Sequence, residues 1–409
     1  MTVIYVRPSE IVPSLAEVPI VDILTACSVP IGALTLTLKR RPFIVVPTDL
    51  CVLGIWVAIV LSNLTWGWFG GAWLGFLTFM PVVFCYFLVR VTLVSPRQFR
   101  GFVYLLVLLN LFQAVNGIVQ YHTGMGLGGF AAVGEEHRIR GTGIFNDPND
   151  LGMTLVMTTP FLLGGLFATG AKVRHRLLWL LILLPMLVAM YYTNSRGTVI
   201  ALGAVLVAFG FGRLHSISGT LIGSAAVLAL VIFGPSRTSA MDASESSAQS
   251  RVEAWGEGLG MLKANPVFGV GFGRFLEFHY KVAHNSLVHT LAELGLFGTF
   301  FLVGAFYGFF RATRLLGRSG SADPDAMHWS KGLFMSAVAA VVCGFFLSRQ
   351  YVVLPYILLA MGLSRATMRI QDAKPFWSNS LVQVATVGVL TAGTVVAIWI
   401  LVRTLGAWS

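Results

Sequence analysis

Long apolar runs alternate with short polar connections along nearly the whole chain. A helix that crosses the hydrocarbon core of a bilayer needs about 20 mostly apolar residues. With that template, the pattern predicts about twelve membrane-spanning helices. Their ranges are 20–38, 43–62, 69–89, 102–121, 151–169, 177–193, 197–212, 216–234, 285–310, 332–348, 350–364 and 381–402. The fold class that we expect is therefore an all-α polytopic membrane protein.

Two longer polar stretches, 122–150 and 235–283, interrupt this pattern. The second divides the chain into an N-terminal bundle at 1–234 with about eight spans, a large loop at 235–283, and a C-terminal bundle at 284–409 with about four spans. No internal repeat relates the two bundles.

The large loop carries a helical pattern of its own over residues 251–264. Ser250 and Glu253 fit a capping box, and Asn265-Pro266 is typical of a helix end. Apolar residues between them recur at helical spacing, which predicts an amphipathic helix lying against the membrane domain. Arg251 then falls in the first turn, where a cation is unfavourable unless it helps the free N–H groups to bind a phosphate or diphosphate. The alternative is a solvated arginine balanced by nearby glutamates.

Composition supports the membrane assignment. Of 409 residues, 56% are hydrophobic and 11% are charged, with a mean hydropathy of +0.79. A chain with so few charged residues could not cover the surfaces of several soluble domains. Disordered, disulfide-stabilised and nucleic-acid-binding classes are excluded as well. No metal or cofactor motif is found, and the four cysteines lie in apolar runs without ligand spacing.

The formal net charge of +11 is distributed unevenly between the two sides of the membrane. The odd-numbered connections hold 17 of the 28 Lys and Arg residues against three acidic residues, and the other side holds 11 of each sign. The remaining three acids, Asp22, Asp49 and Glu293, lie within predicted spans. By the positive-inside rule the odd-numbered connections are cytoplasmic, so that both long loops face outward. Twelve spans would place both termini outward as well, although polytopic proteins more often keep their termini inside. The excess positive charge therefore indicates orientation and does not point to an acidic partner.

Several polar residues then fall on the outward side. Asp147-Pro148 is typical of an N-cap followed by Pro at the first helical position, but this leaves Arg138, Arg140 and Asn149 unexplained. Arg196 lies in a connection so short that it must sit at the membrane surface, where a lone arginine is often only an anchor.

The chain re-enters the membrane at His284-Asn285-Ser286, followed by His289 and Glu293 on one helix face. Glu293 within a span needs a partner or a water-filled cavity, and His289 is the local candidate. That pair can be purely structural. His284, His289 and Glu293 have no further ligand nearby in the sequence, which does not favour a zinc site.

Several of these segments together resemble the O-antigen ligase and O-antigen polymerase superfamily. They are Ser195-Arg196-Gly197, Arg251 to Gly273 with Trp255 and Asn265-Pro266, His284-Asn285-Ser286-Leu287, and Leu291 to Gly298. Phe145 to Asn149 and Phe345 to Tyr351 also look like that superfamily. The resemblance covers about residues 100–365 and is strongest over 250–300.

The resemblance implies a glycan transferase of the inner membrane, with a fold similar to the C-type glycosyltransferases and a large periplasmic loop. Such proteins move a glycan from an undecaprenyl-diphosphate carrier to an acceptor hydroxyl without a metal or cofactor. Carried over by position, Arg196 and Arg251 would bind the diphosphate, and His284 would lie near the acceptor hydroxyl. Arg138, Arg140, Asn149, Asn285, Arg349 and Tyr351 are candidate substrate-binding residues. The partners would be the carrier-linked donor, membrane lipids, and a glycan or a lipid A core as acceptor.

Two other classes of function compete with this hypothesis. A flippase for the same lipid-linked sugars would suit twelve spans, although transporters usually show paired halves or broken helices. A structural or receptor-like scaffold predicts no clustering of arginines. Within the leading hypothesis, the segment from Asn146 to Asn149 favours the polymerase over the ligase branch only slightly.

Overall fold

The structure is a computed structural model of the chain. It describes residues 1–20, 23–24, 44–134, 136–168, 170–214, 246–319, 324–370 and 374–405. Each of the ten predicted spans that these residues cover coincides with a helix, and no strand forms among the described residues. Seven of the described helices are long and apolar enough to cross a bilayer. The prediction of an all-α polytopic membrane protein is therefore confirmed, while the predicted spans 20–38 and 216–234 lie almost entirely outside the described residues.

The chain forms two compact units whose segments alternate along the sequence. Unit 1 comprises Met1–Ile31, Ser95–Met241 and Gly320–Cys343, and unit 2 comprises Gly32–Val94, Asp242–Ser319 and Gly344–Ser409. The division at residues 234 and 283 stays a prediction about the order of segments along the chain.

Unit 1 is built around α6 and α7, which pack against each other and against α8, with α9 against α7. Its helices are α1 (Thr2–Val6), α2 (Pro8–Ile11), η1 (Pro13–Leu15), α6 (Pro96–Thr123), η2 (Leu127–Gly129), η3 (Gly143–Phe145), α7 (Pro148–Leu166), α8 (Val173–Tyr192), α9 (Arg196–Leu214) and most of α15 (Pro324–Phe346). Asp147 caps α7 through the Asn149 amide, with Pro148 at the first helical position, as predicted.

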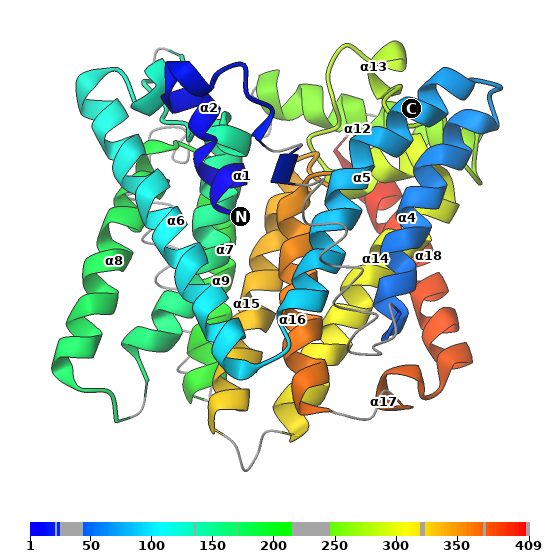
Figure 1. The fold of residues 1–409 in the computed structure, drawn as a ribbon. Helices are drawn as coiled ribbons and strands as arrows, with labels where there is room; N and C mark the ends of the chain where they lie inside the picture. Colours follow the sequence, from blue (N-terminus) through cyan, green and yellow to red (C-terminus); the bar gives the residue numbers. More distant parts are fainter. Residues whose placement is uncertain are drawn as a thin grey trace. The chain divides into compact units, whose positions relative to one another are not determined.

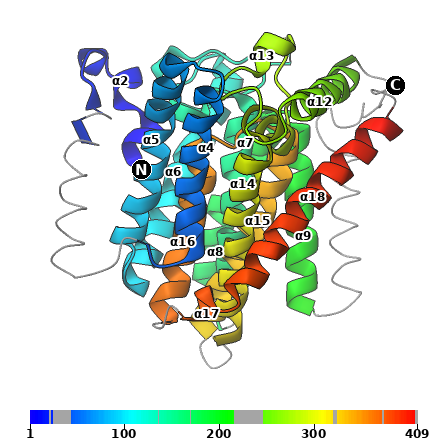
Figure 2. The same ribbon diagram turned by 90° about the vertical axis from the view of Figure 1, so that its right-hand side faces the viewer.

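Unit 2 is organised around α14, which contacts α4, α12, α16 and α18. Its helices are α4 (Pro47–Leu64), α5 (Phe69–Thr92), α12 (Ser246–Ala264), α13 (Phe275–Phe278), α14 (Ser286–Ser319), α16 (Val353–Arg369), α17 (Lys374–Trp377) and α18 (Ser380–Thr404). Figures 1 and 2 show α13 and α17 at opposite ends of these long helices. Because α13 belongs to the predicted outer loop and α17 to a cation-rich connection, the two ends correspond to the two predicted sides of the membrane.

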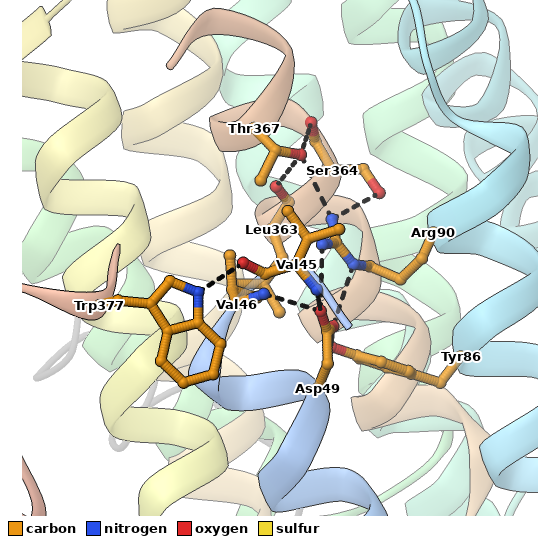
Figure 3. A network of polar contacts seen from close by, with 9 residues as sticks. All are labelled: Val45, Val46, Asp49, Tyr86, Arg90, Leu363, Ser364, Thr367 and Trp377. Carbon is orange, nitrogen blue, oxygen red and sulfur yellow. Dashed lines mark hydrogen bonds and ion pairs between the residues drawn. The ribbon is translucent and has the colours of Figure 1, made fainter. Parts of the chain in front are cut away.

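A buried polar network joins three helices of unit 2 at the end where α17 lies (Figure 3). Asp49, in the first turn of α4, accepts hydrogen bonds from the Val46 amide at 3.0 Å and from the Tyr86 hydroxyl at 2.6 Å. Arg90 of α5 pairs with the same carboxylate at 3.2 Å and donates to Ser364 of α16 at 3.4 Å. Asp49, an acid that the sequence places within a span, thus has its cation and its hydrogen-bond donors inside unit 2.

Helix α14 is not the straight span predicted over 285–310, because it breaks at Gly295. The backbone there has φ 63° and ψ −161°, a conformation available to glycine and to hardly any other residue. A break releases backbone groups on both sides, which must be satisfied inside a membrane protein.

The glycine-rich loop before α13 satisfies those groups. Val270 and Gly271 donate their amides to the carbonyls of Ala292 and Glu293, at 2.9 and 3.1 Å. The amides of Leu296 and Phe297, beyond the break, donate to the carbonyls of Pro266 and Val267 at 2.9 and 3.0 Å. The two motifs Gly269 to Gly273 and Leu291 to Gly298 are therefore two halves of one packing unit.

Candidate functional site

The helix of the outer loop begins earlier than the sequence indicated. Helix α12 starts at Ser246, so Ser250 is an internal residue and Arg251 lies beyond the first turn. The predicted capping box is wrong, because Ala248 and Gln249 continue the helix and nothing between Ser246 and Ser250 interrupts it. Arg251 therefore does not lie among the free N–H groups of the helix start. The predicted end at Asn265 and the packing against the membrane helices are confirmed.

The position of Arg251 follows instead from Trp255, one turn further along α12. The Trp255 indole donates to the Ala283 carbonyl at 2.7 Å, and its ring packs edge-on against Phe345 at 5.4 Å. Residues four apart share a helix face, so half-buried Arg251 lies on the side of α12 that faces the segment ending in His284. Lys281 of that segment also donates to Ser250 at 3.3 Å.

His284 lies two residues before the first residue of α14, in a left-handed conformation with φ 47°. That conformation is uncommon for a residue with a side chain and is often found at functional positions. Asn285 follows as the cap, and its side-chain Oδ1 accepts from the amides of Leu287 and Val288 at 3.0 and 3.1 Å. The fully buried Asn285 thus fixes the helix start, and we assign it to support of the backbone around His284.

Arg349 and Tyr351 lie in the turn between α15 and α16, beside the start of α14. The Ser286 hydroxyl accepts from the Arg349 amide at 3.0 Å and donates to the Leu347 carbonyl at 2.6 Å. The Tyr351 ring contacts Phe272 at 4.9 Å and His289 at 6.2 Å. Unit 2 therefore brings Arg251, His284, Asn285, Arg349 and Tyr351 to one end of α14.

A buried polar cluster lies directly beneath this group of residues. His289 pairs with Glu293 at 3.1 Å, which confirms the predicted partnership, and Glu293 also accepts from the Phe275 amide at 3.2 Å. His289 Nδ1, Glu293 Oε2 and the Tyr351 hydroxyl find no hydrogen-bond partner among the described residues. Burial, together with the negative charge of Glu293, raises the pKa of the Tyr351 hydroxyl well above its usual range.

The remaining predicted site residues lie in unit 1. Arg138 donates to the Thr193 carbonyl at 2.9 Å and to Asn149 at 3.2 Å, so that Arg138 and Asn149 are in direct contact. Arg196 is the first residue of α9, directly after Ser195, whose hydroxyl accepts from the Thr198 amide at 3.4 Å. Arg138 is therefore held at the end of α8 through the Thr193 carbonyl, and Thr193 lies three residues before Arg196 along the chain. Arg196 itself lies at the start of α9, where the helix dipole favours an anion.

Arg140 does not share this position. Its guanidinium donates to the Ala131 carbonyl at 2.9 Å and lies 5.3 Å from the centre of the Phe130 ring. These contacts secure the turn at 126–131. The structure therefore gives Arg140 a role in holding the loop at 122–150. Its guanidinium has other partners than that of Arg138, although the two residues are neighbours in the sequence.

A row of amide side chains on α6, which the sequence analysis missed, holds the loop at 122–150. Gln120 accepts from the Arg140 amide at 2.7 Å, Asn116 accepts from the Leu127 amide at 2.8 Å, and Gln113 accepts from the Thr142 amide at 3.0 Å. The signal was available, because buried amides recur at helical spacing within an apolar span.

Residues 1–11 form a second unforeseen support of the same loop. The Glu10 carboxylate accepts from the Gly143 amide at 2.8 Å, and the buried Tyr5 packs against Phe145 with 4.6 Å between ring centres. The Tyr5 hydroxyl also lies 3.0 Å from Thr154 Oγ1 on α7. Residues 1–11 therefore lie on the same side of unit 1 as the loop at 122–150.

Unit 2 also contains an apolar pocket of about 470 Å³ between α12, α14 and α18. It is lined by Leu259, Leu262, Lys263, Pro266, Leu296, Val395, Val396 and Trp399. Lys263 is the only charged residue of this lining. Elsewhere in the described part of the chain, no three side chains of His, Cys, Asp or Glu gather in a way that could hold a metal ion.

Comparison with known families matches residues 181–303 to a family described as O-antigen ligase. The matched region includes Arg196, Arg251, His284 and Asn285, together with the glycine-rich loop and the break in α14. A comparison with curated proteins finds no match. The family match supports the superfamily to which the sequence motifs pointed, and with it a glycan transfer function in the membrane.

Proposed function

We propose that this chain, a multi-pass membrane protein of the O-antigen ligase and polymerase superfamily, moves a glycan from an undecaprenyl-diphosphate carrier to an acceptor hydroxyl. The observation that carries the proposal is the gathering of Arg251, His284 and Arg349 at the start of α14. These residues come from three segments of unit 2, and two of them lie in the region that matches the family.

Transfer forms a bond between the acceptor oxygen and the sugar carbon C1 while the bond from C1 to the diphosphate oxygen breaks. The leaving diphosphate gains negative charge, which guanidinium groups stabilise through charge-assisted hydrogen bonds. We assign this role to Arg251, with Arg349 as a second cation. A single displacement of this kind inverts the configuration at C1.

The acceptor hydroxyl must lose its proton as it attacks. A neutral histidine has an unperturbed pKa of about 6.5 and can accept that proton near neutral pH. We assign the proton-accepting role to His284, whose backbone is held by the Asn285 cap and by the bond from Trp255 to Ala283. We also propose that Tyr351 contacts the acceptor glycan.

In unit 1, we propose that Arg196 and Arg138 bind an anion such as a diphosphate, with Asn149 orienting Arg138. In unit 2, the apolar pocket beside Lys263 would take part of the polyprenyl chain, because its lining offers almost only hydrocarbon. Arginine groups take the place of a metal in this mechanism.

We further propose that the protein lies in the bacterial inner membrane and works on the periplasmic face. The sidedness rests on the excess of cations in the odd-numbered connections. Polymerisation of carrier-linked repeat units is favoured slightly over ligation to a lipid A core. Product analysis decides between them: a ladder on the carrier indicates a polymerase, and a capped core indicates a ligase.

The decisive experiment incubates the purified protein with carrier-linked glycan and acceptor. Arg251→Ala should abolish transfer while the protein stays folded in the membrane, and full activity of this variant would remove the diphosphate role. His284→Ala should lower the transfer rate more than it lowers donor binding. A loss confined to donor binding would show that the base is another residue. Arg100→Ala, at an exposed arginine near the start of α6, is the matched control and should keep its activity.

A flippase remains the second candidate because α14 is a broken helix, a feature of transporters. In transporters the released backbone groups bind substrate or ions, whereas here the glycine-rich loop occupies them. Sealed vesicles separate the two functions. An enzyme changes the glycan on one face, while a flippase moves labelled lipid across the membrane without changing it.

A further inference from the structure

Ser286 connects two parts of the proposed site that are far apart in the sequence. Its hydroxyl donates to the Leu347 carbonyl at 2.6 Å and accepts from the Arg349 amide at 3.0 Å. One side chain thus uses both its donor and its acceptor on the same turn. A Cβ placed on Gly344 would lie 3.5 Å from the Ser286 hydroxyl, so the end of α15 runs directly past this residue.

The other contacts of this turn hold its flanks. Phe345 packs against Trp255, and the Tyr356 hydroxyl donates to the Gln350 carbonyl at 2.6 Å. Within the turn, the Val352 amide also donates to the Arg349 carbonyl at 3.4 Å, and the Arg349 guanidinium donates to the Ser348 carbonyl at 3.3 Å. The bond to Ser286 ties the Arg349 backbone to α14. It therefore sets where the Arg349 side chain leaves the main chain.

Ser286 also follows His284 by two residues, and between them Asn285 fixes the start of α14. The separation between the backbones of His284 and Arg349 is consequently set by one capped helix turn and one hydroxyl. A change at Ser286 acts on Arg349 without altering either charged side chain.

We propose that Ser286 is a positioning residue, which holds Arg349 beside the first turn of α14 so that its guanidinium binds the diphosphate of the donor. This inference rests on the proposed function, because it takes undecaprenyl diphosphate as the ligand. Ser286 itself touches neither the reacting atoms nor the phosphate. Its contribution passes through Arg349.

A double-mutant cycle tests this dependence. Binding of undecaprenyl diphosphate without glycan is measured by native mass spectrometry for the purified wild type, Ser286→Ala, Arg349→Ala and the double variant. Loss of a hydrogen bond to a buried backbone group typically weakens an equilibrium by about tenfold, which is the loss expected for Ser286→Ala. Since the two residues act in series, the double variant should bind no more weakly than Arg349→Ala.

The matched control is Thr290, one turn further along α14. Its hydroxyl donates at 2.7 Å to the Ser286 carbonyl, within the same helix, and therefore has no direct link to the turn. Thr290→Val should bind the lipid as the wild type does. If Ser286→Ala does not survive purification, Ser286→Cys keeps the size but has only a weak donor and acceptor, and the same cycle is run with it.

Three results would overturn the inference: unchanged affinity in Ser286→Ala, unchanged affinity in Arg349→Ala, or losses that multiply in the double variant. Failure of the proposed function looks different. A wild type that binds the lipid but transfers no glycan would refute the enzyme and leave the positioning role intact. A wild type that does not bind undecaprenyl diphosphate would refute both the carrier and the inference.

Discussion

Gly295 is a position where a single added methyl group should disturb unit 2 strongly. A Cβ at this residue would lie 2.4 Å from the Val267 carbonyl oxygen and 2.7 Å from the Gly269 amide nitrogen. Both are backbone atoms, which cannot rotate away as a side chain can. Gly295→Ala must therefore push the glycine-rich loop out of the break in α14.

The expected cost has two parts. A residue with a side chain held at this backbone conformation costs about 1–3 kcal/mol. Displacing the loop also weakens four backbone hydrogen bonds, each worth about 0.5–1.5 kcal/mol. Because the loop can shift without losing all four, we expect a loss of about 3–5 kcal/mol, at the upper end of single-residue effects. For units of this size that corresponds to a decrease in Tm of roughly 10 °C.

The assay is the fraction of monodisperse protein that remains in detergent after heating, read by fluorescence-detected size-exclusion chromatography. Gly260→Ala is the control, because Gly260 lies within α12 and an added Cβ would have no atom within 4 Å. That variant should keep or slightly raise the Tm, since alanine favours a helix over glycine by about 1 kcal/mol. A Gly295→Ala protein as stable as the wild type would refute the insertion of the loop into the break.

Two further predictions concern buried polar groups of unit 2. Arg90→Met leaves the Asp49 carboxylate buried without its cation and should lower the free energy of unfolding by about 3–5 kcal/mol. Adding Asp49→Asn should recover part of that loss, and equal Tm values for the single and double variants would contradict this. Tyr351 has a raised pKa, so its contribution to stability is complete below pH about 10 and is lost as the pH rises further. The Tm difference between the wild type and Tyr351→Phe should therefore stay constant from pH 6 to about 9 and shift against the wild type above about 10, and a shift near neutral pH would disprove the assignment.

Several local features were predictable because neighbouring residues decide them. Asp147 and Pro148 start α7 as expected, since a cap and a proline act within one helical turn. The pairing of His289 with Glu293 was predictable for the same reason, because residues four apart on a helix are neighbours.

Features that depend on a distant partner were missed. The break at Gly295 needs the loop from Pro266 to Gly271 to satisfy its backbone groups, and no local pattern shows that match. The start of α12 at Ser246 was missed for a different, local reason, because Ser250 is an equally suitable cap residue. The contacts of residues 1–11 with the loop at 122–150 could not be predicted either, since more than 130 residues separate Glu10 from Gly143.

The sequence by itself determined that this chain is a bundle of membrane helices, because partition into a bilayer depends on stretches of about 20 residues. The cations beside those stretches predict its sidedness. Only the tertiary structure decided which polar residues of distant segments come to the same end of α14, among them His284 and Arg349 of unit 2. It also bound Arg138 and Arg140 to different backbone carbonyls, those of Thr193 and Ala131. Buried polar groups must find hydrogen-bond partners wherever the fold provides them, and no single stretch of the chain predicts which groups will pair.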